Sequence, residues 1–215
     1  MKDTIYSREQ YLRKKAAEKE PLNIQLTNNY AFRKLFKMNY IARGFLIALL
    51  GLDEEDVVKL EVIDPFEEGE NRRRKEGILD IKIYLNDNKK INIEMQNRYQ
   101  EDWTERSLFY NCRMFTEGLY HGQPYGDLEP CIHVGILDFD LMKTPGFHHH
   151  IKLLDIKTNE EYSSKLQFHV VQLKQVESAT EEENRQNCTI GRNYLRQRIG
   201  SRSRKQSVGT HIERR

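Results

Sequence analysis

The chain lacks the features that would place it in a membrane or in an oxidising compartment. None of its 215 residues belongs to an apolar run of about eighteen or more, so we expect no transmembrane helix. The first twenty residues are charged throughout and contain no apolar stretch, which argues against a secretory signal. The three cysteines are scattered, odd in number and without the spacing of a metal site. Together these absences predict a cytoplasmic protein with reduced thiols and no membrane partner.

Two further absences concern ligands. The chain contains neither a G-x-x-x-x-G-K-[ST] loop nor a G-x-G-x-x-G turn, so the sequence does not support nucleotide-dependent chemistry. Basic and acidic residues are nearly equal in number over the whole chain, with 35 Lys/Arg and 33 Asp/Glu. The balance is uneven along it: residues 184–215 hold nine Lys/Arg and one Glu, which leaves 26 and 32 for residues 1–183. A tail of net charge +8 on a body of net charge −6 is compatible with nucleic-acid binding but does not select it.

The hydrophobic pattern divides the chain into a charged arm over residues 1–23, a folded domain over 24–183 and the basic tail over 184–215. Helical spacing predicts a helix capped by Thr27 or Asn28, a second that ends at Gly51, and a long third that ends near Gly122. The third helix has apolar residues at Trp103, Leu108, Phe109, Met114, Phe115 and Leu119.

Strand-like segments surround these helices. One contains Val58, Leu60 and Val62, two form a hairpin over residues 78–96, and three follow at 131–141, 148–159 and 166–176. The order helix, helix, strand, hairpin, helix and three strands predicts an α/β domain with a mixed sheet flanked by helices. His148, His149 and His150 stand together at the start of the segment 148–159, and we expect a solvated turn there rather than a metal site.

The hairpin ILDIKIYLNDNKKINIEMQ, residues 78–96, carries acidic residues on strands that otherwise look like core. Its apolar side chains all fall on odd-numbered positions, and side chains alternate between the two faces of a strand. Directly paired residues of an antiparallel ladder point to the same face, so odd must pair with odd. A three-residue loop over residues 86–88 then pairs Leu85 with Lys89 and sets Asp80 opposite Glu94.

Two carboxylates in this arrangement would have Cβ atoms roughly 5 Å apart and would raise each other's pKa. A hard divalent cation such as Mg²⁺ or Mn²⁺ would offset their repulsion and could activate water beside a phosphate, with Gln96 on the same face. The alternative is a water-exposed sheet face without function, on which Lys82 pairs with Glu94.

Several blocks, in order, resemble the Rpn family of recombination-promoting nucleases, also described as transposases, within the PD-(D/E)XK nuclease superfamily. They cover about residues 24–183 and are LTNNYAFRKLFK, ILDIKIYL, INIEMQNRYQEDWTERSLFY, QPYGDLEPCIHVGILDF and HVVQLK. The resemblance implies a restriction-endonuclease-like mixed β-sheet flanked by helices. It also implies Mg²⁺ or Mn²⁺ as cofactor and DNA as substrate.

By this resemblance Asp80, Glu94 and Gln96 are the catalytic residues, and the two carboxylates hold the metal. Gln96 stands where the superfamily more often has Lys and this family commonly has Gln; unlike Lys, it carries no positive charge. The resemblance also suggests that Arg106 and Tyr110, four residues apart on one helix face, contact phosphate. The alternative for Arg106 is a surface pair with Asp102.

The sequence departs from the family at two places. The family often has Asp where this chain has Asn29, and it continues past residue 183 with an acidic helical stretch. Here the composition changes abruptly near Asn184 to Arg and Ser without apolar periodicity. We interpret the change as a shift of reading frame that truncates the family's domain; the rival interpretation is a basic arm that binds DNA phosphates.

These observations predict a metal-dependent DNA endonuclease that hydrolyses phosphodiesters. Two alternatives stay open. One is a truncated, catalytically inactive family member that only binds DNA or a protein partner, and the other is a structural sheet domain without a site. The sequence does not decide the oligomeric state, and a homo-oligomer is compatible with it.

Overall fold

The computed structural model describes residues 28–63, 81–86 and 88–178. The predicted arm over 1–23, the tail over 184–215 and Asp80 lie outside the described residues. The first two described helices are α2 (Asn29–Phe36) and α3 (Asn39–Leu50). The Asn28 side chain accepts the amide N–H of Ala31 at 3.2 Å, as an N-cap does, and Gly51 ends α3 with φ +64°. Both helix ends are therefore confirmed.

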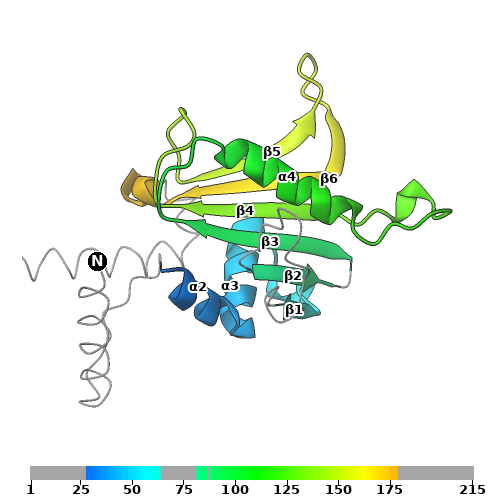
Figure 1. Cartoon of the computed structure of the whole chain (residues 1–215), viewed down its shortest axis with the longest axis horizontal. Coiled ribbons are helices and arrows are strands. Elements are labelled where there is room, and N and C mark those ends of the chain that lie inside the picture. Colours follow the sequence, from blue (N-terminus) through cyan, green and yellow to red (C-terminus); the bar gives the residue numbers. More distant parts are fainter. Residues whose placement is uncertain (1–27, 64–80, 87, 179–215) are drawn as a thin grey trace, which may run out of the picture.

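Six strands form one mixed sheet in the order β1-β2-β3-β4-β6-β5 (Figure 1). They are β1 (Leu60–Ile63), β2 (Ile81–Leu85), β3 (Lys89–Gln96), β4 (Cys131–Leu137), β5 (His148–Leu154) and β6 (Glu161–Gln172). The strands β3, β4 and β6 run parallel, and the other neighbours are antiparallel. The predicted mixed sheet and the predicted order of elements are confirmed. Val58, in contrast, precedes β1 and is 84% exposed, so its prediction as a strand residue was wrong.

The hairpin has the predicted register. Leu85 pairs with Lys89 and Ile81 with Ile93, across a loop over residues 86–88. Asn86 turns the chain there with φ +54°, and its side-chain oxygen accepts the backbone N–H groups of Val58 and Lys59 at 3.0 Å each. Asn tolerates this left-handed conformation better than most residues. The side chain therefore ties the hairpin turn to the segment before β1.

Helices cover the two faces of the sheet (Figure 1). The odd-numbered residues of β2 and β3 pack with α2 and α3 in the larger hydrophobic cluster, which includes Phe36, Leu46, Ile83 and Ile93. Helix α4 (Trp103–Thr116) lies on the opposite face, where Trp103 packs with the β4 and β6 side chains in a smaller cluster. No helix among the described residues is long and apolar enough to cross a membrane.

Helix α4 departs from its prediction in length and orientation. It ends at Thr116, before the predicted Gly122, because the chain leaves the helix at Glu117 with ψ 131°. Its buried side is mostly polar or amphipathic, whereas Leu108 and Phe109 are 44% and 54% exposed. The apolar positions thus indicated a helix but not which side of it faces the sheet. The buried residues are Trp103, Ser107, Tyr110, Asn111 and Met114.

Candidate active site

Glu94 lies two residues before the end of β3, on the face that α4 covers. Its neighbours on this face of β3 are Asn92 and Lys90, and the three side chains are between 0% and 5% exposed. The alternative of a water-exposed face is therefore wrong for β3. A carboxylate buried to this extent needs a counter-ion or hydrogen-bond donors, because removing an isolated charge from water is very costly.

A glycine makes room for the helix above Glu94. Gly135 of β4 stands beside Glu94 in the parallel register. A Cβ atom at Gly135 would lie 2.7 Å from Cζ2 of Trp103, the first residue of α4. The indole ring is 1% exposed and occupies the space that any other residue at Gly135 would fill. Gly135 thus lets α4 approach the sheet beside the carboxylate.

Replacing Gly135 with Ala should therefore lower the free energy of unfolding by about 1–3 kcal/mol, the usual cost of overpacking a well-filled core. Urea unfolding followed by the fluorescence of Trp103, the single tryptophan of the chain, measures the change at the point of contact. Gly44→Ala in α3 is the matched control, since nothing lies within 4 Å of the added methyl group. The control should gain about 0.5–1 kcal/mol. Equal stability of the Gly135→Ala variant and the unmodified protein would contradict this account of the packing.

Arg106 follows Trp103 by one helical turn and reaches the carboxylate. Its Nη2 donates to Glu94 Oε1, and Nη1 lies 3.5 Å from Gln100 Oε1. The structure thus pairs Arg106 with Glu94 and not with Asp102, to which Arg106 is joined by the helical backbone bond. The guanidinium carbon also lies 5.3 Å from the centre of the Tyr110 ring. Burial raises the pKa of the Tyr110 hydroxyl, and the positive charge of Arg106 opposes the shift.

Gln96 is the last residue of β3 and lies two positions beyond Glu94 on the same face. Its amide nitrogen donates to the backbone carbonyl of Arg98 at 3.1 Å. The backbone carbonyl of Gln96 accepts the N–H of Asp138, the residue that follows β4. The hairpin register is as predicted up to the pair Ile81 and Ile93, the residues adjacent in sequence to Asp80 and Glu94. Asp80 itself lies outside the described residues.

Two polar residues beneath α4 were not singled out from the sequence. His133 of β4 stands beside Asn92 in the register, and Asn92 Nδ2 lies 3.0 Å from His133 Nδ1. Burial, with a smaller contribution from the charge of Arg106, lowers the pKa of His133 to about 3, so this imidazole is neutral. The neutral ring accepts the Asn92 hydrogen bond at Nδ1 and carries its proton on Nε2. The sequence did carry a signal for this pair, because Asn92 and His133 are polar residues within otherwise apolar strand segments.

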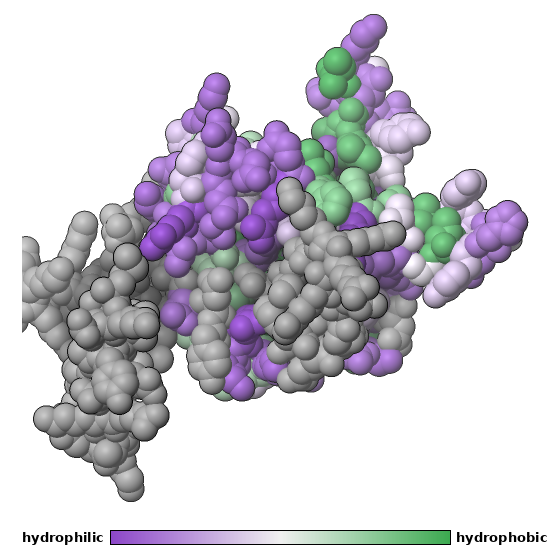
Figure 2. Space-filling model, viewed as in Figure 1, coloured by the Kyte–Doolittle hydropathy of each residue, from purple (hydrophilic) through white to green (hydrophobic). Residues whose placement is uncertain are grey.

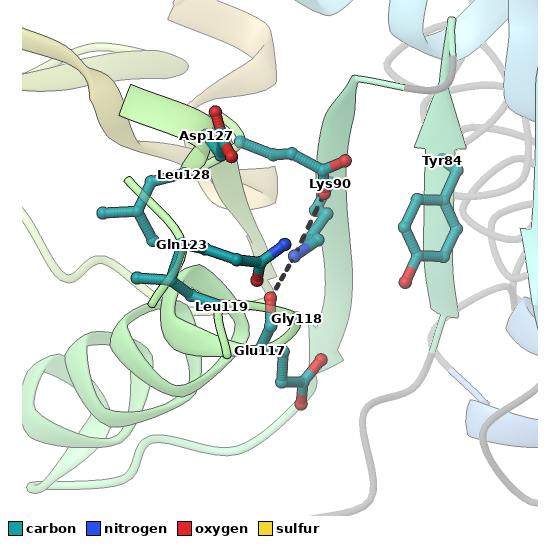
Figure 3. A pocket seen from close by; sticks show the side chains of 9 residues that line it. Tyr84, Lys90, Glu117, Gly118, Leu119, Gln123, Asp127 and Leu128 are labelled. Carbon is teal, nitrogen blue, oxygen red and sulfur yellow. Dashed lines mark hydrogen bonds and ion pairs between the residues drawn. The ribbon is translucent and has the colours of Figure 1, made fainter. Parts of the chain in front are cut away.

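A hollow lies at the C-terminal end of α4, away from Glu94 (Figure 3). It has a volume of about 430 Å³, and Tyr84, Lys90 and Glu117 contribute to its wall. Lys90 Nζ donates to the Glu117 carbonyl at 2.6 Å and pairs with Glu129 at 3.1 Å. Three carboxylates line this hollow, namely Glu117, Asp127 and Glu129. Glu117 and Glu129 are paired with Lys82 and Lys90, which leaves no lysine of these pairs for a phosphate, so we do not assign the DNA site to this hollow.

The histidine run does not form the solvated turn that we expected. His148, His149 and His150 begin β5, and alternation puts the first and third against His169 of β6. The His150 and His169 ring centres are 4.1 Å apart, and His148 Nε2 lies 2.8 Å from His169 Nδ1. Burial, then the charges of His150 and His148, lower the pKa of His169 to about 3. The prediction of a turn was wrong because these residues pair with β6 as a strand, although His150 stays exposed.

Among the residues that the structure describes, no three His, Cys, Asp or Glu side chains are grouped closely enough to hold a metal ion. This applies to the histidine stack and to Glu94 alike. The described side chains thus do not define a metal site at Glu94 by themselves. The predicted second carboxylate, Asp80, is adjacent in sequence to Ile81, which pairs with Ile93.

Comparison with known families gave one match that covers most of the chain. The model of a family described as "PD-(D/E)XK nuclease family transposase" matches residues 26–195. The match begins near the predicted start of the domain at residue 24 and extends past its predicted end at 183. Its description agrees with the resemblance noted from the sequence, and the mixed sheet agrees with a restriction-endonuclease-like fold. Searches of curated proteins and of solved structures returned no match.

Proposed function

Because this chain belongs to the PD-(D/E)XK nuclease family transposases, we propose that it is a metal-dependent DNA endonuclease with its catalytic centre at Glu94. Family membership supports a nuclease-like function in general. The observation that supports this particular site is the carboxylate of Glu94, which is 2% exposed near the end of β3 and bonded to Arg106 of α4. A buried ionisable group with a specific charge partner is a candidate for a functional site.

Asp80 and Glu94 would hold the metal ion, Mg²⁺ or Mn²⁺. The donor set fits such an ion, because both residues offer the hard carboxylate oxygens that these cations prefer. An ionised carboxylate can accept at about four lone-pair positions, so the Arg106 hydrogen bond does not exhaust Glu94. When bound, the ion would polarise a phosphate oxygen and lower the pKa of a coordinated water.

The other residues of the site have separate roles in this proposal. Gln96 orients the attacking water through its side-chain amide, without the positive charge that Lys would supply. Arg106 binds phosphate oxygens through its planar fork of N–H donors, and Tyr110 supports the guanidinium with its ring. Water attacks phosphorus, the bond to the bridging oxygen breaks, and the leaving oxygen takes up a proton. DNA is the proposed substrate.

An inactive, DNA-binding member of the family is the second candidate. One observation favours it: the Gln96 amide nitrogen donates to the Arg98 carbonyl, which occupies one of its two N–H donors. The Asn29 departure points the same way. The two candidates share the fold and differ in whether DNA is cleaved.

Thermal melting with and without Mn²⁺ tests the metal site. We expect Mn²⁺ to raise the melting temperature of the unmodified chain, because an ion that binds only the folded state stabilises it by mass action. At a concentration of 100 Kd the gain would be about 2.7 kcal/mol. The rise should vanish in Asp80→Ala and persist in Asp102→Ala, which removes a carboxylate that caps no helix bond.

Plasmid cleavage by the same three proteins then separates the two candidates. Cleavage with Mg²⁺ that disappears in Asp80→Ala supports the endonuclease. Binding of DNA without any cleavage supports the inactive member. The absence of an Mn²⁺ effect on all three proteins would reject a metal site at the hairpin.

A further inference from the structure

The position of Arg106 raises a question about how the proposed site is loaded. The guanidinium donates to Oε1 of Glu94, the carboxylate that would hold the metal ion. The Glu94 side chain is 3% exposed, so its environment screens charges far less than water does. Arg106 and a divalent cation are both positive and both need this carboxylate. Their binding to Glu94 must therefore be coupled, and unfavourably so.

Three features suggest that the Arg106 side chain can leave Glu94. It is 32% exposed, in contrast to the carboxylate that it contacts. Its Nε atom is buried without a hydrogen-bond acceptor among the described residues, so its present position leaves one donor unsatisfied. Its contact with Gln100 is long, at 3.5 Å. An unsatisfied buried donor destabilises the present position of the side chain, which lowers the cost of moving the guanidinium to another anion.

We propose that Arg106 is an exchangeable counter-ion: it neutralises Glu94 in the metal-free protein and moves to a phosphate of the substrate DNA when the Asp80–Glu94 pair is loaded. The inference rests on the proposed function. It adds that one side chain couples metal binding to DNA binding. Coupling of this kind is reciprocal, so DNA should strengthen metal binding by the factor by which metal strengthens DNA binding.

The neighbours of Arg106 suit the second position as well as the first. Tyr110 lies one turn further along α4, and its ring supports the guanidinium from below at 5.3 Å. An arginine matches a phosphate with two parallel N–H donors, a geometry that a lysine cannot reproduce. The same residue can therefore serve as the internal partner of a carboxylate and as the partner of a substrate phosphate.

Calorimetric titration with Mn²⁺ tests the proposal on binding alone, without an activity measurement. The variant Arg106→Gln retains an amide donor for Glu94 and removes the charge. It should bind Mn²⁺ at least about tenfold more tightly than the unmodified chain, because a like charge next to the ion has been removed in a partly buried site. It should also bind a short DNA duplex more weakly. A role in structure alone would not increase the affinity for the metal.

Arg113→Gln is the matched control. It removes a positive charge from the same helix, two turns further on, where the side chain lies 3.9 Å from Glu117. Its Mn²⁺ affinity should stay within about twofold of the unmodified chain, since two helical turns separate this charge from the site and salt screens charges at such a separation. The double variant Asp80→Ala, Arg106→Gln tests whether the tighter Mn²⁺ binding depends on the proposed carboxylate pair. We expect this double variant to lose Mn²⁺ binding.

The outcomes distinguish this inference from the function on which it rests. Mn²⁺ binding that depends on Asp80 but is no tighter in Arg106→Gln overturns the exchange and leaves the metal site in place. Failure of every protein to bind Mn²⁺ overturns both. If Arg106→Gln does not fold, hydrogen exchange at Arg106 Nε in the unmodified chain decides. Its rate should change when Mg²⁺ and DNA are added, because the N–H leaves its buried position, and an unchanged rate overturns the proposal.

Discussion

Replacing Glu94 with Gln should reduce DNA cleavage by about a hundredfold or more, because the contribution of a catalytic metal ion amounts to several kcal/mol and each 1.36 kcal/mol changes the rate tenfold. The fold should survive, since the Gln side chain still offers an oxygen to Arg106 and has nearly the same volume. Plasmid cleavage with Mg²⁺ measures the activity, and circular dichroism measures the fold.

Glu105→Gln is the control for this experiment. Glu105 is exposed in the first turn of α4, next to Arg106 in sequence, and its replacement removes a carboxylate without entering the site. We expect its cleavage rate to stay within about twofold of the unmodified chain, as is usual for a surface substitution. Undiminished cleavage by Glu94→Gln would mean that the catalytic carboxylate lies elsewhere.

A second large effect is expected on the free energy of unfolding at acidic pH. The structure buries two neutral histidines, His133 and His169, and in each the pKa falls from about 6.5 in an unfolded chain to about 3. The unfolded chain therefore binds more protons below pH 6.5. Stability should be complete above pH 6.5 and fall by about 1.4 kcal/mol per pH unit and per histidine as the pH drops towards 3. Between pH 7 and 5 the two together should cost about 4 kcal/mol.

Urea unfolding at pH 7 and pH 5 measures this loss. His133→Gln should remove about half of it, because glutamine does not titrate and can still accept from Asn92. His121→Gln is the control: His121 is exposed in the turn after α4, and its replacement should leave the pH dependence unchanged. If His133→Gln and His121→Gln lose as much stability as the unmodified chain, the buried histidines are not the cause of acid sensitivity.

Alternation of side chains was the most reliable part of the sequence analysis. Parity required a loop with an odd number of residues, because a shift by one residue would have moved an entire apolar row to the wrong side. Together with a three-residue loop it predicted the pair Leu85 and Lys89. The mostly apolar run at Cys131–Leu137 likewise became a central parallel strand that is buried at every position. Helix ends at Asn28 and Gly51 followed from capping chemistry.

The faces of α4 and β3 could not be predicted in this way. Helical spacing shows which residues share a side of α4. It does not show which side faces the sheet, and the structure buries Tyr110 and Asn111 instead of Leu108 and Phe109. The burial of Glu94 depends on a helix that follows it in the chain and on Gly135, forty-one positions later. The histidine stack needs β5 and β6 side by side. Each of these features is a contact between segments that are distant in sequence.

The position of β6 has a consequence for the newly made chain. Strand β6 lies between β4 and β5 in the sheet but follows both in the sequence. Until residues 161–172 have left the ribosome, β4 therefore presents an unpaired edge of seven buried-type residues, CIHVGIL, and β5 has no partner. Such edges invite pairing with other chains. Figure 2 shows that apolar residues also gather on the outer part of the hairpin that β5 and β6 form in the finished fold, where Ile156 is 93% exposed. The interval before β6 emerges is thus the stage of synthesis at which this protein most needs protection by chaperones.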